Sequence, residues 1–287
     1  MQAQFNLSKL APMSERTASR TALATAHMRA AHQLLDPPPR ILEDPAAVAV
    51  LGPDAEQRIR ELAERSQTPE GRTLRAHMVL RSRFAEDRLA AAVDRGVTQY
   101  VILGAGFDTF AVRQPPWARS LRILEVDHAG TQELKRAHLA AADLVVPPNA
   151  GFATIDFERE SLRDGLLRHG ISPAARTFFS WLGVTMYLQK SAIDAVLRSV
   201  AQFPAGSEIV LTFASASNTP RPIAERAAHI GEPWLSFFEP AEMRDELLAA
   251  GFTTVELLTP AVAQERYFRQ GSSLPTPQRT TIVTAVR

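Results

Sequence analysis

A glycine pair with an acidic residue close behind it is the first feature of this sequence that could bind a small molecule. Gly104 and Gly106 follow the apolar run 100–103 and precede Asp108. Glycines at this spacing permit a tight turn and let a ligand approach the backbone closely. In an open parallel sheet, the first turn from strand to helix is the usual phosphate or nucleoside site. We therefore expect Gly104, Ala105, Gly106 and Asp108 to contact a nucleoside-containing cofactor.

A third glycine at position 109 would complete the fingerprint of a dinucleotide-binding loop, and this chain has Thr109 there. Its absence disfavours a nicotinamide-dependent oxidoreductase, which stays open as an alternative on the same class of sheet. Another alternative is that the two glycines serve only to make a tight turn.

Two acidic residues end the next apolar run, about 20 positions after the glycines, where a carboxylate can accept hydrogen bonds from ribose hydroxyls. These residues are Glu125 and Asp127. Being two apart, they face the same side of a strand. The sequence therefore predicts a ribose contact here, and the alternative is a pair of solvated charges at a strand end.

The following run ends in an aspartate and an aromatic residue, Asp156 and Phe157. The carboxylate can accept from an adenine amino group, and the ring offers apolar cover to the base. An aspartate at this point could equally cap the next helix.

A single arginine lies near the centre of an apolar helical face. Arg81 shares this face with Leu74, Met78, Ala85, Leu89 and Ala92. A guanidinium there must find an anion or extend to solvent. A carboxylate of a bound cofactor is one candidate, and an internal ion pair with an Asp or Glu is the other. Arg88 also lies toward this face.

Alternating strands and helices must position these residues. The expected strands are 100–103, 121–126, 152–155, 177–181, 208–213, 254–258 and 280–286, and helical segments separate most of them. This alternation predicts an α/β fold with a mostly parallel seven-stranded sheet and helices on both faces. Only the segment 259–277 lacks a clear helix, which indicates that the final strand is antiparallel.

The first part of the chain has a different texture and is expected to be helical. A helix over residues 14–35 is stopped by Asp36 and the three prolines that follow it, and a second runs from about Pro69 to Asp94 and ends at Gly96. We expect residues 1–97 to form a helical extension that acts as a lid, packed on a core of residues 98–287 in one structural unit.

Composition limits the partners. Among 287 residues, 32 Lys plus Arg oppose 31 Asp plus Glu, so the net charge of +1 gives no basic excess for nucleic acid or an anionic membrane. The absence of cysteine excludes disulfides, thiolate metal sites and cysteine nucleophiles, and we expect no bound metal. Residues 1–10 lack the apolar core of a signal peptide, and no long apolar run occurs. We expect a cytoplasmic protein with a small-molecule partner; the oligomeric state stays open.

Several motifs in this order resemble those of the leucine carboxyl methyltransferase family, in particular its bacterial branch of S-adenosylmethionine-dependent, polyketide-type O-methyltransferases. The resemblance runs from about Thr17 to the end of the chain, and Gly183-Val184-Thr185-Met186-Tyr187-Leu188 is its most family-specific part. The other segments are Thr17-Ala18, Arg29-Ala30, Ile41-Leu42-Glu43-Asp44-Pro45, Arg81-Ser82-Arg83-Phe84, Leu103-Gly104-Ala105-Gly106-Phe107-Asp108-Thr109, Glu125-Val126-Asp127 and Asp156-Phe157.

The resemblance implies a Rossmann-like class I methyltransferase fold with S-adenosyl-L-methionine as cofactor. It also implies a role for each matching position. Arg81 would hold the cofactor carboxylate, Gly104 and Gly106 would line the methionyl part, and Asp127 would take the ribose. Asp156 with Phe157 would take the adenine.

Two positions depart from the family pattern. Leu182 stands where the family usually has a glutamate that contacts the methionyl end, and Phe110 stands where an arginine is common. Both replacements are expected to remove a polar contact near the cofactor. They keep open the alternative that this is a vestigial protein, which binds the cofactor without transferring a methyl group.

The expected chemistry is an in-line displacement at a sulfonium methyl, for which the protein mainly aligns the reactants and excludes water. His27, His32 and His128 are candidate bases, and none is assigned as catalytic, because a lone histidine is more often a packing or surface residue. Trp234, Phe237 and Phe238 could form an aromatic wall for the acceptor or simply pack in the core. We expect the acceptor to be a carboxylate or hydroxyl oxygen on a small, partly aromatic or polyketide-like molecule.

Overall fold

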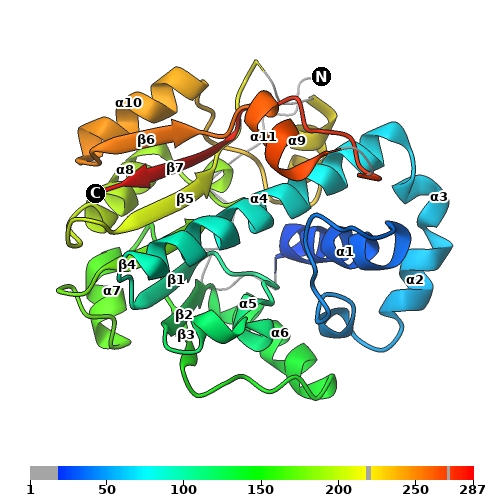
Figure 1. Ribbon diagram of the computed structural model, residues 1–287, viewed down its shortest axis with the longest axis horizontal. Helices are drawn as coiled ribbons and strands as arrows, with labels where there is room; N and C mark the ends of the chain where they lie inside the picture. Colours follow the sequence, from blue (N-terminus) through cyan, green and yellow to red (C-terminus); the bar gives the residue numbers. More distant parts are fainter. Residues whose placement is uncertain (1–18, 218–220, 270–271) are drawn as a thin grey trace, which may run out of the picture.

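Seven strands form a single sheet in the order β3-β2-β1-β4-β5-β7-β6 (Figure 1). The computed structural model describes residues 19–217, 221–269 and 272–287, so Thr17, Ala18 and the start of the helix expected from residue 14 lie outside the described residues. The strands are β1 Gln99–Leu103, β2 Arg122–Asp127, β3 Ala150–Thr154, β4 Thr177–Trp181, β5 Glu208–Thr212, β6 Thr254–Leu257 and β7 Ile282–Val286.

The directions of the strands show which edge of the sheet is expected to bind a ligand. Neighbouring strands from β3 to β5 are parallel, whereas β7 is antiparallel to both β5 and β6. The expected sheet with a final antiparallel strand is therefore confirmed. Because chain order reverses between β1 and β4, the carboxyl ends of these two strands form the switch point where α/β sheets bind ligands.

Alternating side chains of the strands feed two apolar cores, one on each face of the sheet. Val101 and Leu103 face the core covered by α7 Leu162–Arg168, α8 Lys190–Val200 and α10 Pro240–Ala250. Tyr100 and Ile102 face the opposite core, covered by α4 Pro69–Asp94, α5 Phe110–Arg113 and α11 Pro260–Tyr267. Strand β1 is buried along its whole length, which explains its continuous apolar run.

Helix α11 corrects the expectation that residues 259–277 contain no helix. It begins at Pro260, and the side chain of Thr259 accepts a hydrogen bond from the Val262 amide as an N-cap. This capping arrangement stabilises a helix that is only eight residues long. Two further helices complete the core region, α6 Ala129–Ala141 and α9 Arg221–His229.

The N-terminal region is helical, as expected. Helix α1 Arg20–Leu35 ends just before Asp36, and α2 Ala55–Glu61 and α3 Ala63–Ser66 lead into α4, whose ends agree with the prediction. Helix α4 shares an apolar core with β1, so it belongs to the layered core as much as to the N-terminal region. The division of the chain at residue 97 stays a prediction. In the part of the chain that the structure describes, no helix combines the length and apolar character needed to cross a membrane.

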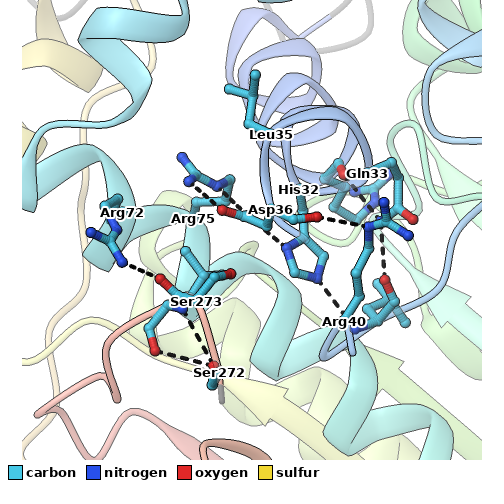
Figure 2. Close-up of polar contacts among 12 residues, drawn as sticks. His32, Gln33, Leu35, Asp36, Arg40, Arg72, Arg75, Ser272 and Ser273 are labelled. Atoms are coloured by element: carbon cyan, nitrogen blue, oxygen red, sulfur yellow. Dashed lines mark hydrogen bonds and ion pairs between the residues drawn. The ribbon is translucent and has the colours of Figure 1, made fainter. Parts of the chain in front are cut away.

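A buried ionic cluster joins the end of α1 to α4 (Figure 2). Asp36 accepts two hydrogen bonds from Arg75, at 2.7 and 2.8 Å, and its Oδ2 lies 2.8 Å from Nδ1 of His32. All three residues are at most 3% exposed. Burial alone would raise the pKa of Asp36, but the hydrogen bonds from His32 and Arg75 outweigh it, and the pKa falls below 3.8. Together these contacts fix the end of helix α1 to α4.

We expect Arg75→Met to lower the free energy of unfolding by about 3–5 kcal/mol, because it leaves a carboxylate buried without its bidentate partner. Urea denaturation followed by circular dichroism measures this. The control is Arg60→Met, which breaks the exposed pair with Glu56 and should cost no more than about 0.5 kcal/mol. Equal losses in the two variants would contradict the assignment.

The same cluster sets a pH dependence. Since the pKa of Asp36 is lower in the folded than in the unfolded chain, its contribution is complete above pH 3.8 and is lost as the pH falls through the folded value. Acid titration of the free energy of unfolding should therefore show a smaller loss in Arg75→Met than in the wild-type protein.

Candidate functional site

The glycine turn after β1 adopts a backbone that requires glycine. Gly104 and Gly106 have φ values of +64° and +51°, in the left-handed region. A Cβ at Gly104 would lie 2.2 Å from Cγ2 of Val184, so a larger residue would also clash with the segment after β4. The turn thus lies against that segment, and Gly104, Ala105 and Gly106 line the neighbouring cavity.

Asp127 at the end of β2 closes this turn. Its Oδ2 accepts a hydrogen bond from the Gly106 amide at 2.6 Å, and its Oδ1 accepts from the His128 amide at 2.7 Å. Burial raises the pKa of Asp127, and the two backbone hydrogen bonds oppose that rise. Each oxygen keeps lone-pair capacity for a further donor, such as a hydroxyl group.

A cavity of about 500 Å³ lies at the carboxyl ends of β1, β2 and β4, covered by α1 and by the segment after α9. Its size is within the usual range for small-molecule and cofactor sites. The structure brings eight of the ten predicted site residues to its wall, namely Arg81, Gly104, Ala105, Gly106, Asp108, Asp127, Phe157 and Leu182.

Arg81 reaches this cavity without a carboxylate partner among the described residues, so the internal ion pair considered for it is not formed. Arg88 does form one, with Glu208 at 2.5 Å. Burial lowers the pKa of Arg81 to about 10, and the charge of Arg29 adds to the effect. A Cβ at Gly183 would lie 2.5 Å from Nη1 of Arg81, so glycine at 183 leaves room for the guanidinium. The cavity wall therefore carries a partly desolvated cation that an anionic group would stabilise.

Glu125 is not at the cavity wall. Although it faces the same side of β2 as Asp127, it lies one pleat deeper and pairs with Lys135 of α6, with both side chains 2% exposed. Burial raises the pKa of Glu125, and Lys135 opposes that rise. The pair joins the helix to the strand, and the predicted ribose contact stays a prediction for Asp127 alone.

Asp156 is also not at the cavity wall. Its Oδ1 accepts a hydrogen bond from the Glu158 amide at 3.0 Å, and it pairs with Arg159 at 3.7 Å. It thus stabilises the turn after β3. The capping alternative is wrong, because the next helix, α7, has Ser161 as its N-cap. Phe157 does line the cavity and packs edge-on against Trp181, with ring centroids 6.1 Å apart. An adenine contact here would use the ring.

The two positions that depart from the family pattern lie in different surroundings. Leu182 is at the cavity wall, where it makes that stretch apolar. Phe110 is 1% exposed and packs edge-on against Tyr100 at 5.2 Å, outside the residues that line the cavity. The expectation that Phe110 removes a polar contact near the cofactor is therefore wrong, because its ring belongs to the core under α4.

The cover of the cavity depends on Glu232, a residue that the sequence analysis did not single out. Its carboxylate accepts hydrogen bonds from the Arg20 amide at 2.8 Å, the Thr21 amide at 3.3 Å and the Ser19 hydroxyl at 3.2 Å. It therefore holds the first turn of α1, where unpaired amides favour a negative charge. No local pattern could predict this contact, which spans more than 200 residues.

Of the aromatic segment, Pro233 and Leu235 line the cavity with Glu232. Trp234 instead packs against Tyr187 and Phe237, at 6.4 and 6.1 Å between ring centroids, and Phe238 is buried. The expected aromatic wall of Trp234, Phe237 and Phe238 is therefore not found among the residues that line the cavity.

The candidate bases lie in three different settings. His128 lines the cavity, His32 belongs to the Asp36 cluster, and the Nδ1 of His27 bonds to the Leu23 carbonyl. Tyr187 is a further polar residue at the cavity wall, and burial raises the pKa of its hydroxyl, so it is protonated at neutral pH.

Behind the glycine turn, a buried carboxylate connects three elements. Asp44 is 0% exposed and accepts a hydrogen bond from Thr109 Oγ1 at 2.6 Å. It also pairs with Arg113 at 3.2 Å and with Arg29 of α1 at 3.6 Å. Arg29 donates a further hydrogen bond to the Phe107 carbonyl, so helix α1 and the glycine turn share one ionic network.

Metal ligands are not gathered at this site. Over residues 19–217, 221–269 and 272–287, no group of three or more His, Cys, Asp or Glu side chains is arranged to hold an ion.

Comparisons with known proteins give the family of the chain and its fold. The model of the leucine carboxyl methyltransferase family matches residues 22–201. A Bacillus subtilis protein named "Putative S-adenosyl-L-methionine-dependent methyltransferase YktD" is 34% identical over 226 residues, which cover 73% of this chain and 74% of that protein. A Parafrankia protein with the same type of name is 34% identical over 203 residues, covering 67% of this chain and 62% of that protein.

Two solved structures share the fold. A protein from Thermobifida fusca, described as a "putative methyltransferase", superposes with a TM-score of 0.60 at 17% identity, covering 96% of this chain and 97% of the other. A DUF574 family protein from Streptomyces avermitilis gives a TM-score of 0.58 at 17% identity, covering 94% and 97%. At this identity the comparison shows the arrangement of strands and helices.

We expect Asp44→Asn to lower the free energy of unfolding by about 3–5 kcal/mol, because Arg113 and Arg29 lose a buried negative partner. Hydrogen exchange should rise at residues 104–110 and in α1 more than in the distant helix α8. The control is Asp54→Asn, at an exposed pair with Arg58 that is 3.8 Å long. Unchanged exchange at the glycine turn would show that Asp44 does not position it.

Proposed function

The chain belongs to the leucine carboxyl methyltransferase family, and we propose that it transfers the methyl group of S-adenosylmethionine to an oxygen of a small-molecule acceptor. That it is an S-adenosylmethionine-dependent methyltransferase follows from the family match and from the relative at 34% identity. The oxygen acceptor is the proposed part. Arg81 is the observation that carries the cofactor site, because it places a cation without a carboxylate partner among the described residues beside the glycine turn. The cover over the cavity, formed by α1 and residues 232–235, is the observation that favours a small acceptor.

The residues at the cavity wall fit the cofactor. Arg81 suits the methionyl carboxylate, since it is partly desolvated and lacks a carboxylate partner among the described residues. The backbone of Gly104 and Gly106 is open to close approach. Asp127 has oxygen lone pairs left for ribose hydroxyls, and Phe157 offers an apolar ring to a base. Anion, hydroxyl and base contacts thus occur in the order of the groups along the cofactor.

When bound, the cofactor supplies a methyl group activated by its sulfonium centre. The chain contributes binding, alignment and exclusion of water. Arg81 and Asp127 fix two separate parts of the ligand, which limits its rotation between them. Helix α1 and residues 232–235 cover the cavity, and Glu232 holds these two covers together.

The class of acceptor depends on whether its oxygen must lose a proton before it attacks the methyl group. Leu182 at the wall has no titratable group, and we assign no general base. A carboxylate acceptor is already ionised at neutral pH and needs none, whereas a phenol or alcohol needs one or a lowered pKa. His128 and the hydroxyl of Tyr187 also line the cavity and can hydrogen-bond to an acceptor oxygen.

The cover over the cavity favours a small acceptor. Helix α1 is anchored at both ends, at Glu232 and at the Asp36 cluster, so a folded protein surface would have to displace it. The net charge of +1 gives no support for a nucleic acid. Leu182 supports the second candidate, a protein that binds the cofactor without transferring a methyl group.

We expect Arg81→Met to weaken S-adenosylhomocysteine binding by about 2 kcal/mol, roughly 30-fold, and to leave adenosine binding unchanged, because only the first ligand carries a carboxylate. Isothermal titration calorimetry measures both. Arg83→Met is the matched control, since Arg83 is exposed two residues further along α4 and pairs with Asp87. Equal weakening of both ligands would contradict the assignment of Arg81.

The acceptor is tested with S-adenosylmethionine that carries a labelled methyl group, incubated with separate pools of aromatic acids, phenols and host protein extract. We expect label in one of the small-molecule pools. Base-labile label indicates a methyl ester, and stable label indicates an ether. Label only in protein would overturn the small-molecule proposal, and no label despite cofactor binding would favour the binding protein.

A further inference from the structure

Arg81 lines the cavity, and two further basic residues, His77 and Arg279, lie near it but outside the residues that line the cavity. His77 lies four residues before Arg81 on α4, so the two side chains share one face of the helix. The Nδ1 atom of His77 is buried and has no hydrogen-bond partner. A polar atom left in this state is costly, which points to a partner that a ligand supplies.

Arg279 is the third member. It lies three residues before β7, at the carboxyl edge of β5, because Ile282 pairs with Thr212 and the Phe213 amide donates to the Thr281 carbonyl. Thr212 in turn accepts a hydrogen bond from the Gly183 amide, and Gly183 lies against Arg81. Arg279 is half-buried and has no hydrogen bond or ion pair within the described parts of the chain.

The electrostatics agree with this proximity. Burial lowers the pKa of His77 to about 3, and the charges of Arg81 and Arg279 add to the effect. His77 is therefore neutral at pH 7 and can donate one hydrogen bond. Burial also lowers the pKa of Arg279.

Other buried arginines of this region have carboxylate partners. Arg75 pairs with Asp36, Arg88 with Glu208, and Arg29 and Arg113 with Asp44. Arg81, at the cavity wall, and Arg279 are exceptions, since neither has a carboxylate partner among the described residues. One anion, the cofactor carboxylate, satisfies Arg81 under the proposed function. Arg279 then remains without a counter-ion within the part of the chain that the structure describes.

We propose that Arg279, with His77 beside it, binds a negatively charged oxyanion group of the methyl acceptor. The inference rests on the proposed function and narrows it, because the acceptor is then an organic acid that enters past Arg81 toward the segment before β7. The charged group can be a carboxylate, a sulfate or a phosphate, since each presents oxygen acceptors to a guanidinium.

The test uses the full chain saturated with S-adenosylhomocysteine, so that Arg81 already has its carboxylate. Benzoate and its uncharged isostere benzamide are titrated by calorimetry, followed by phenyl sulfate and phenyl phosphate. We expect at least one of the three anions to bind at least about tenfold more tightly than benzamide. An equal affinity of all four compounds would overturn the proposal.

Variants locate the anion. Arg279→Gln should weaken binding of the preferred anion about tenfold and leave S-adenosylhomocysteine binding unchanged, whereas Arg279→Lys should retain most of the affinity. His77→Phe should give a smaller loss. The control is Arg269→Gln, because Arg269 is exposed and bonds to the Glu265 carbonyl. Full anion affinity in folded Arg279→Gln would overturn the proposal.

Failure of the two proposals can be distinguished. If the wild-type chain binds no S-adenosylhomocysteine, the proposed function fails. The anion titration is then repeated without cofactor, comparing the Arg81→Met variant with the Arg81→Met/Arg279→Gln double variant. Weaker anion binding by the double variant would still support the anion site, and equal binding by the two would overturn it.

Discussion

A single buried carboxylate, that of Asp44, is the group on whose contacts the glycine turn and helix α1 both depend. It accepts a hydrogen bond from Thr109 and faces the guanidinium groups of Arg29 and Arg113. Removing a carboxylate from water is costly, and two cations together with a hydroxyl donor offset that cost. Because Arg29 also bonds to the carbonyl of Phe107, the distance between helix α1 and the glycine turn is set by hydrogen bonds as well as by apolar packing.

Close packing of side chains against glycine backbone determines the positions of other residues at the cavity wall. Two glycines, Gly104 and Gly183, each leave the space in which a neighbouring side chain lies, Val184 for the first and Arg81 for the second. The guanidinium is thus placed by the turn after β4, although it extends from α4. Leu182 packs against the same apolar core that contains Phe110. Contact with this core accommodates an apolar side chain at position 182.

Much of the fold could be predicted from the sequence, because β-branched runs, proline stops and glycine turns act locally. The bounds of α4 and β4 follow from such patterns. The antiparallel direction of β7 was predicted correctly, but from the absence of a helix over residues 259–277, where the structure has α11. At the site, the glycine turn and Asp127 were accessible for the same reason. Glu125 and Asp156 were placed on the right elements, but a strand-end pattern does not show whether a carboxylate meets a ligand, a lysine or the next turn. The contacts of Glu232 and Asp44 join distant parts of the chain, and no local pattern encodes them.

The position of β7 has a consequence for synthesis of the chain. Strand β7 lies between β5 and β6, and β6 is hydrogen-bonded in the sheet through β7. Residues 254–257 are synthesised well before residues 282–286, so β6 has no strand to pair with until β7 has left the ribosome. The growing chain can assemble the parallel strands from β3 to β5 in the meantime, because their neighbours are already made. During that interval the edge of β5 is open, which is the stage at which a nascent chain is exposed to pairing with another molecule.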